Sequence, residues 1–236
     1  MNMLDKDKQY IWHPFTQMKL EKDRKAIVKG EGVYLIDEAG NRYIDAIGSW
    51  WTSTFGHAHP YIAEQVSKQV KELEHVIFAG FTHRPAVALA ERMLQVLPDN
   101  QQKIFFSDNG STAVEVALKM AFQYWHNLDS PRYHIVALKN AYHGDTFGAM
   151  SVSGPGYYTD PFKPNLFKVH FIDTPTPGNE GKALNQLRSI IKETGPLAAF
   201  IAEPLVHGAE GMIMYEAEAL DQLIAEVKHH ETLVIV

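Results

Sequence analysis

The sequence has no cysteine among its 236 residues, so it can form neither a disulfide nor a cysteine-bound zinc site. It has no excess of positive charge either: the formal net charge is −6, which argues against nucleic acid as a partner. No apolar stretch approaches the ~20 residues of a membrane-spanning helix, and the polar, mixed-charge residues 1–10 are unlike a signal peptide. From these absences we expect a soluble, cytoplasmic protein with no membrane partner.

What the sequence does contain, from residue 101 onward, is a regular alternation of apolar and amphipathic segments. It predicts strands at 104–107, 135–138, 168–172, 197–202 and 233–236, and helices at 112–126 and 216–230. Strands that are apolar on both faces and separated by helices are typical of a mostly parallel sheet with helices on both faces. The predicted fold class is therefore α/β.

The residues before this region have a different texture. Residues 10–20 are rich in aromatic side chains and predict an N-terminal arm, and the alternation over 26–45 predicts a β-hairpin with its turn at 38–41. Amphipathic helices are expected at 60–74 and 85–97. We expect two domains: residues 1–60 hold the arm, the hairpin and a Trp-rich loop, and residues 61–236 form the large domain.

A candidate anion site follows the predicted strand at 104–107. Gly110 allows a phosphate to approach the backbone, and Ser111 and Thr112 add hydroxyl donors at the start of a helix, where free N–H groups and the helix dipole favour negative charge. Thr112 and Glu115 have the spacing of a capping box, which predicts a helix that begins near Thr112. An ordinary strand-to-helix turn with a capped helix remains the alternative.

Further polar groups follow other predicted strands, and such strand ends hold ligands in open α/β sheets. Tyr142 and His143 come after the strand at 135–138 and could stack on a flat aromatic cofactor, although Tyr142 could equally be a packing residue. Glu203 follows the strand at 197–202 and is either a buried acid that needs a cation or a solvated loop residue. Taken together, these groups favour a phosphorylated aromatic cofactor.

The Trp-rich loop adds two further observations. Trp50 and Trp51 are adjacent and cannot both face a core along an extended chain, so one is expected to face a cavity, an interface or solvent. His57 and His59 lack a third ligand nearby, and we therefore predict no metal site.

Several of these segments carry a resemblance to a known family. They are Trp-His-Pro-Phe-Thr at 12–16, Gly-Ser-Trp-Trp at 48–51, Ser-Asp-Asn-Gly-Ser at 107–111, Asn-Ala-Tyr-His-Gly-Asp-Thr at 140–146 and Ala-Glu-Pro at 202–204. Over essentially its whole length the chain resembles the class III branch of the fold-type I pyridoxal-phosphate aminotransferases. The Trp-His-Pro and Ser-Trp-Trp segments are similar to those of the members that act in biotin synthesis.

The resemblance implies pyridoxal 5′-phosphate as cofactor, a homodimer, and transamination of 8-amino-7-oxononanoate to 7,8-diaminononanoate. It implies that Gly110 and Ser111 bind the cofactor phosphate, and that Tyr142 lies against the pyridine ring and borders the substrate. Trp50 and Phe15 are implied to bind the substrate, and Glu203 to pair with an arginine further along the chain. The implied amino donor is S-adenosylmethionine.

Two departures from the family pattern bear on these expectations. The chain stops at Val236 within a predicted strand, and the family's cofactor-binding aspartate and Schiff-base lysine are expected beyond it, so we assign no catalytic residue. Position 15 is Phe where the S-adenosylmethionine-using members usually carry Tyr, which leaves lysine open as donor. The alternatives are another class III aminotransferase, acting on ornithine, 4-aminobutyrate or an ω-amino acid, and a non-catalytic ligand-binding module.

Overall fold

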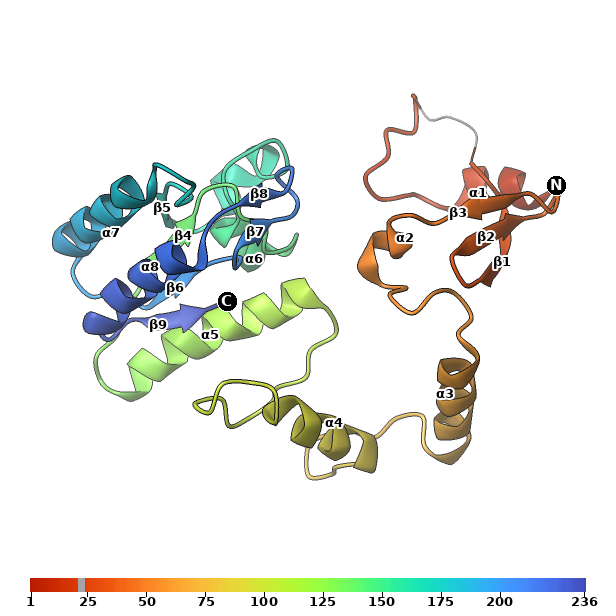
Figure 1. The fold of residues 1–236 in the computed structure, drawn as a ribbon, viewed down its shortest axis with the longest axis horizontal. Helices are drawn as coiled ribbons and strands as arrows, with labels where there is room; N and C mark the ends of the chain where they lie inside the picture. Colours follow the sequence, from red (N-terminus) through yellow and green to blue (C-terminus); the bar gives the residue numbers. More distant parts are fainter. Residues whose placement is uncertain (21–23) are drawn as a thin grey trace. The chain divides into compact units, whose positions relative to one another are not determined.

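A computed structural model describes residues 1–20 and 24–236, which group into two units, Met1–Gln102 and Lys103–Val236 (Figure 1). The predicted domain boundary near residue 60 stays a prediction for the whole protein. Within the described ranges, no helix is both long and apolar enough to cross a membrane.

The second unit is built on a four-stranded sheet. Its strands are β4 (Ile135–Leu138), β5 (His170–Ile172), β6 (Ala199–Ile201) and β9 (Leu233–Ile235). They lie in the order β5-β4-β6-β9, and every neighbouring pair is parallel. The predicted parallel sheet is confirmed.

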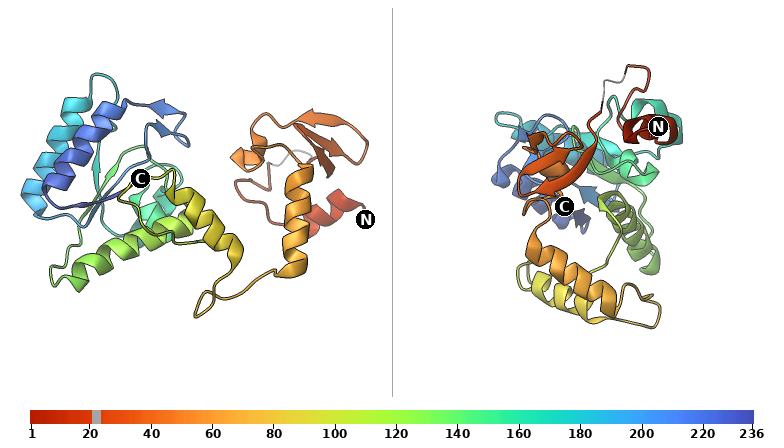
Figure 2. Two further views of the ribbon diagram at one scale, coloured as in Figure 1. Left: turned by 60° about the horizontal axis from the view of Figure 1, so that its bottom comes forward. Right: turned by 90° about the vertical axis from the view of Figure 1, so that its right-hand side faces the viewer.

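Helices cover both faces of this sheet (Figures 1 and 2). The covering helices are α5 (Gly110–Asn127), α6 (Phe147–Val152), α7 (Glu180–Thr194) and α8 (Ala217–His229). Val136 and Leu138 of β4 share a core cluster with side chains of α7 and α8. Ile135 and Ala137 share the opposite cluster with side chains of α5 and α6. Successive side chains of a strand point to opposite faces, so a strand that is apolar throughout can complete both layers.

Three smaller elements lie in the connections between these helices and strands. They are the 3₁₀ helix η1 (Asp160–Asn165) and the antiparallel pair β7 (Val206–His207) and β8 (Ile213–Met214).

The first unit contains a three-stranded antiparallel sheet and short helices. The elements are α1 (Met3–Tyr10), β1 (Ile27–Glu31), β2 (Tyr34–Asp37), β3 (Arg42–Ile44), α2 (Gly48–Trp51), α3 (Pro60–Glu72) and α4 (Arg84–Leu94). The predicted hairpin is confirmed as β2 and β3. Its turn is held by Asp37, whose Oδ1 accepts the N–H groups of Ala39 and Asn41 at 3.0 and 2.8 Å.

The predicted strand at 104–107 is wrong. In the described structure these residues belong to no sheet, and the side chains of Phe105 and Phe106 are 63% and 40% exposed. A strand requires a hydrogen-bonded neighbour as well as an apolar run, and the run alone does not reveal whether a neighbour is present.

Candidate functional site

The candidate anion site begins where α5 starts, two residues before the predicted start. Asn109 is the N-cap: its Oδ1 accepts the N–H of Thr112 at 3.0 Å, and Thr112 Oγ1 accepts the N–H of Asn109 at 3.2 Å. The predicted capping box of Thr112 and Glu115 is therefore wrong by one helical turn. An α-helix offers no acceptor for the N–H groups of its first turn, so those of Gly110 and Ser111 are available to an anion.

Glu115 has a different task from the predicted cap. Its Oε1 accepts the N–H groups of Gly148 and Ala149, at 2.6 and 3.2 Å, at the start of α6. A Cβ at position 148 would lie against the Glu115 carboxylate, which would have to shift and lose its present bonds to α6. Glu115 thus ties the first turn of α6 to α5.

Ser111 anchors the loop that precedes α6. Its Oγ lies 2.7 Å from Thr146 Oγ1 and accepts the Thr146 N–H at 3.0 Å. Gly144 has φ +127, and a side chain there would collide with Ser111. The loop therefore packs directly on the start of α5.

Beside these contacts the second unit has an open hollow of about 670 Å³, within the usual size range of small-molecule sites. It is lined by Asn109, Gly110, Ser111, Val114 and residues 142–146. The structure thus brings together the three predicted cofactor residues Gly110, Ser111 and Tyr142. Paired N–H donors, hydroxyl groups and an aromatic ring around one hollow are a donor set that fits a phosphorylated aromatic molecule.

Tyr142 stands at this hollow with part of its ring exposed. Its hydroxyl donates to Asp145 Oδ2 at 2.8 Å. Burial raises the pKa of Tyr142 to about 12, and the Asp145 carboxylate adds to the rise. The phenol is therefore protonated at neutral pH and acts as a hydrogen-bond donor.

Glu203, just after the end of β6, supports the loop that carries Tyr142 and precedes α6. Its Oε2 accepts the N–H of Tyr142 at 3.1 Å, and its Oε1 accepts the N–H of Gly208 at 2.8 Å. The acid is partly buried, and these partners are backbone groups. Its predicted pairing with an arginine further along the chain stays a prediction.

His143, which follows Tyr142 in this loop, is held by Ser153. The backbone N–H of His143 donates to Ser153 Oγ at 2.9 Å. Burial lowers the pKa of the His143 imidazole to about 4, and His207 contributes further to this lowering. The ring is therefore neutral at pH 7.

The predicted substrate residues Phe15 and Trp50 lie in the first unit. Their rings meet edge to face, with centroids 5.4 Å apart and an interplanar angle of 71°. The structure brings these two together in the first unit, whereas the group around Gly110 belongs to the second unit. The functional roles of all five residues stay predictions.

Sequence reasoning missed several side chains that shape these places. The sequence alone assigns no role to Asp145 or Thr146. Thr146 is the N-cap residue of α6, but its hydroxyl lies against Ser111 Oγ and does not cap the helix. His57, where no metal site is predicted, pairs through its Nε2 with Asp45 Oδ2 at 2.9 Å. Residues 1–20 and 24–236 contain no group of three or more His, Asp or Glu side chains placed to hold a metal ion.

Comparisons with known proteins point to one family. The profile of the aminotransferase class III family matches residues 18–236. The chain is 47% identical, over 233 residues, to an adenosylmethionine-8-amino-7-oxononanoate aminotransferase of Synechococcus elongatus, covering 96% of this chain and 55% of that protein.

Solved structures agree. The crystal structure of the adenosylmethionine-8-amino-7-oxononanoate aminotransferase from Methanocaldococcus jannaschii matches with a TM-score of 0.91 and 36% identity, over 98% of this chain and 53% of that one. A PLP-bound amine transaminase from an uncultivated Pseudomonas species matches with a TM-score of 0.88 and 32% identity, over 95% and 55%. The chain spans about half the length of the curated relatives it matches.

Proposed function

The chain belongs to the class III aminotransferases, which use pyridoxal 5′-phosphate, and on that basis we propose that the protein converts 8-amino-7-oxononanoate to 7,8-diaminononanoate. The observation that carries the proposal is the hollow at the start of α5, where Gly110, Ser111 and Tyr142 come together. The relatives named for this reaction support the substrate, and their names support S-adenosylmethionine as amino donor.

The residues of the hollow divide the binding between them. The N–H groups of Gly110 and Ser111 would hold the phosphate of the cofactor, where the dipole of α5 favours its negative charge. The exposed part of the Tyr142 ring would lie against the pyridine ring, while Asp145 and Glu203 hold the tyrosine in place. When bound, the cofactor supplies the electron sink for removal of the donor's α-proton.

In the first unit, Trp50 and Phe15 would bind the substrate. Trp50 offers a flat apolar face to the alkyl chain of the keto acid, and Phe15 meets Trp50 edge to face. We assign the proton transfer itself to no residue of 1–236.

We further propose that the protein works as a homodimer. In the described first unit, α3 and α4 expose apolar side chains, including Tyr61, Val66, Val70 and Val87. Exposed apolar side chains on a helix surface favour association with another protein surface. Light scattering of the full-length protein should give twice the monomer mass, and a monomer at micromolar concentration would refute this proposal.

The function is tested with the full-length protein and its cofactor. 8-Amino-7-oxononanoate is offered with S-adenosylmethionine, lysine, ornithine and 4-aminobutyrate in separate reactions, and product is detected by mass spectrometry. We expect 7,8-diaminononanoate with S-adenosylmethionine. Absence of 7,8-diaminononanoate with all four donors would overturn the proposed substrate.

A further inference from the structure

The Phe15–Trp50 pair stands on backbone that needs support. Phe15 has φ +54 and Trp50 has φ +58, in the left-handed region that residues with side chains seldom adopt. Such positions persist where the surrounding structure holds them. The two residues are 65% and 59% exposed, so packing around them supplies little of that support.

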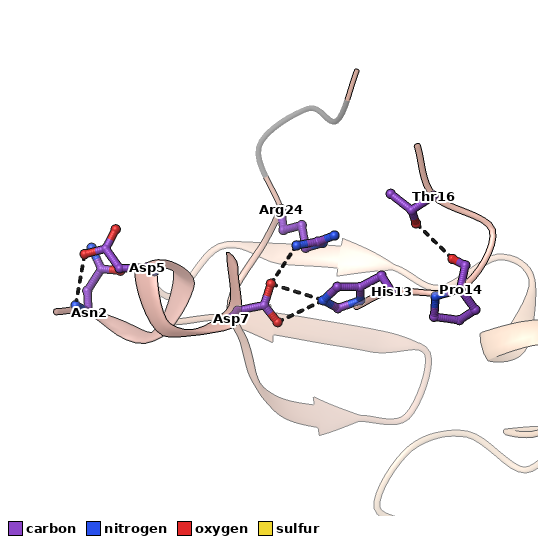
Figure 3. Close-up of polar contacts among 7 residues, drawn as sticks. All are labelled: Asn2, Asp5, Asp7, His13, Pro14, Thr16 and Arg24. Carbon is purple, nitrogen blue, oxygen red and sulfur yellow. Dashed lines mark hydrogen bonds and ion pairs between the residues drawn. The ribbon is translucent and has the colours of Figure 1, made fainter. Parts of the chain in front are cut away.

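One source of support for Phe15 is Asp7 on α1. Both carboxylate oxygens of Asp7 accept from His13 Nε2, at 3.0 and 3.1 Å, and Oδ2 also accepts from Arg24 Nη1 at 2.7 Å (Figure 3). The side chains of Asp7 and His13 are 18% and 29% exposed, which limits competition from water. His13 lies two residues before Phe15, so this bond fixes the arm directly before the ring.

The chain is also fixed around Phe15 itself. Thr16 Oγ1 donates to the carbonyl oxygen of Pro14 at 2.9 Å and closes the turn that contains Phe15 (Figure 3). Pro14 has a restricted φ of its own. Together with the Asp7–His13 bond, this leaves the backbone of Phe15 little freedom to return to the common region.

A second aspartate does the same for Trp50. Asp45 Oδ2 accepts from Ser49 Oγ at 2.7 Å and from His57 Nε2 at 2.9 Å. Its side chain is 7% exposed, and Ser49 directly precedes Trp50 in the same left-handed stretch. A side chain at Gly30 would collide with His57, so the histidine rests against β1.

We propose that Asp7 and Asp45 are positioning residues: through His13, Ser49 and His57 they hold Phe15 and Trp50 in the geometry that binds the keto-acid chain. This inference rests on the proposed function for its substrate. Asp7 bonds to His13 and Asp45 bonds to Ser49 and His57, so each aspartate acts on its ring through the bonded residues near that ring.

The first test compares Asp7→Ala with Asp5→Ala in the full-length protein. Asp5 lies on the same helix and bonds to Asn2, away from the arm, so it controls for damage to α1. We expect Asp7→Ala to lower kcat/KM for 8-amino-7-oxononanoate by about tenfold, the scale of one lost charged hydrogen bond. Cofactor affinity should be unchanged, and Asp5→Ala should behave as wild type. Equal losses in both variants would overturn the proposal.

A readout independent of the reaction is hydrogen exchange of residues 11–19. Exchange should be several-fold faster in Asp7→Ala than in wild type and Asp5→Ala, and Asp7→Asn should recover part of the protection because its amide oxygen still accepts from His13. If wild type does not act on 8-amino-7-oxononanoate, the proposed function fails, but this measurement still tests the contact. Unchanged exchange in Asp7→Ala would overturn the positioning role.

A double-mutant cycle separates positioning from general stability. If Asp7 acts through Phe15, adding Asp7→Ala to Phe15→Ala should lower kcat/KM no further. The same cycle applies to Asp45→Ala with Trp50→Ala. Additive losses in either cycle would show that the aspartate does not act through its ring.

Discussion

The two units of the chain keep their apolar side chains in different places. In the second unit Leu187, Phe200 and Leu223 are almost wholly buried between the sheet and its helices. In the described part of the first unit, the buried apolar side chains are Ala26 and Ala86, whereas Leu20 and Phe55 are 77% and 75% exposed.

This difference indicates how each unit holds its candidate residues. The second unit positions Gly110, Ser111 and Tyr142 on elements packed against a core. The first unit positions Phe15 and Trp50 on left-handed backbone held by hydrogen bonds to aspartates. Truncation of buried apolar side chains should therefore lower the stability of the second unit. In the first unit, loss of the aspartates should disturb the positions of Phe15 and Trp50.

The largest expected effect is on the stability of the second unit. Leu223 is 1% exposed, and Leu223→Ala leaves a cavity, so we expect a loss of about 2–5 kcal/mol in the free energy of unfolding. The matched substitution Leu20→Ala in the first unit should change it by less than about 0.5 kcal/mol. Urea unfolding of both variants measures the contrast, and equal losses would break the comparison.

Trp50→Ala should produce the next largest effect, on substrate handling. Removing the indole takes away the apolar surface proposed for the keto-acid chain, and we expect kcat/KM to fall by roughly 3 kcal/mol in barrier terms, about a hundredfold. Steady-state kinetics and a cofactor titration measure the two properties separately. Loss of cofactor with intact substrate handling would mean that Trp50 is a structural residue.

Much of the second unit was predictable because its core strands are apolar throughout. The predicted strand at 135–138 matches β4 residue for residue, since four fully buried positions leave little choice of element. Residues 104–106 are just as apolar but form no strand, because no strand among residues 1–20 and 24–236 pairs with them. Strand pairing is a property of the whole fold, which a local pattern does not contain.

For the candidate site as well, the sequence predicted the local motif but not the contacts between residues far apart in the chain. Gly110 and Ser111 lie in a sequence pattern typical of a turn followed by a helix, and both line the hollow. The contacts of Ser111 with Thr146 and of Glu115 with Gly148 span more than thirty residues, and no spacing rule for a local motif reaches that far. The capping box was misplaced because Asn109 and Thr112 both suit an N-cap, and the sequence alone does not decide between them.

Ser111→Ala tests the anion site of the second unit. Loss of the hydroxyl removes a donor beside the proposed phosphate position and the bond to Thr146, so we expect cofactor binding to weaken by roughly 1–3 kcal/mol. Ser189→Ala is a suitable control, because Ser189 lies on α7 and bonds to Glu193. Unchanged affinity of the cofactor-free protein for pyridoxal phosphate would place the phosphate elsewhere.

The pH dependence of stability should reveal His143. Its folded pKa is about 4 and its ordinary value 6.5, so between these values the unfolded state binds a proton that the folded state excludes. Stability should therefore fall as pH is lowered, by about 2 kcal/mol from pH 7 to pH 5 for this group. Urea unfolding of the cofactor-free protein at both pH values, compared with His143→Gln, isolates this contribution. An identical pH dependence in the two proteins would contradict it.

The smallest expected effect belongs to Phe15→Tyr. An aromatic ring at this position can stack on an adenine with or without a hydroxyl, and a new hydrogen bond contributes about 0.5–1.5 kcal/mol net, at most about tenfold in rate. The phenylalanine alone should therefore not abolish use of S-adenosylmethionine, and Phe15→Tyr should raise activity with that donor modestly. Wild type and variant are assayed with S-adenosylmethionine and with lysine separately. Because the rings of Phe15 and Trp50 meet edge to face, Phe15→Leu serves as the control that removes the aromatic contact. Activity with lysine alone, unmoved by Phe15→Tyr, would refute the proposed donor and leave the proposed keto acid standing.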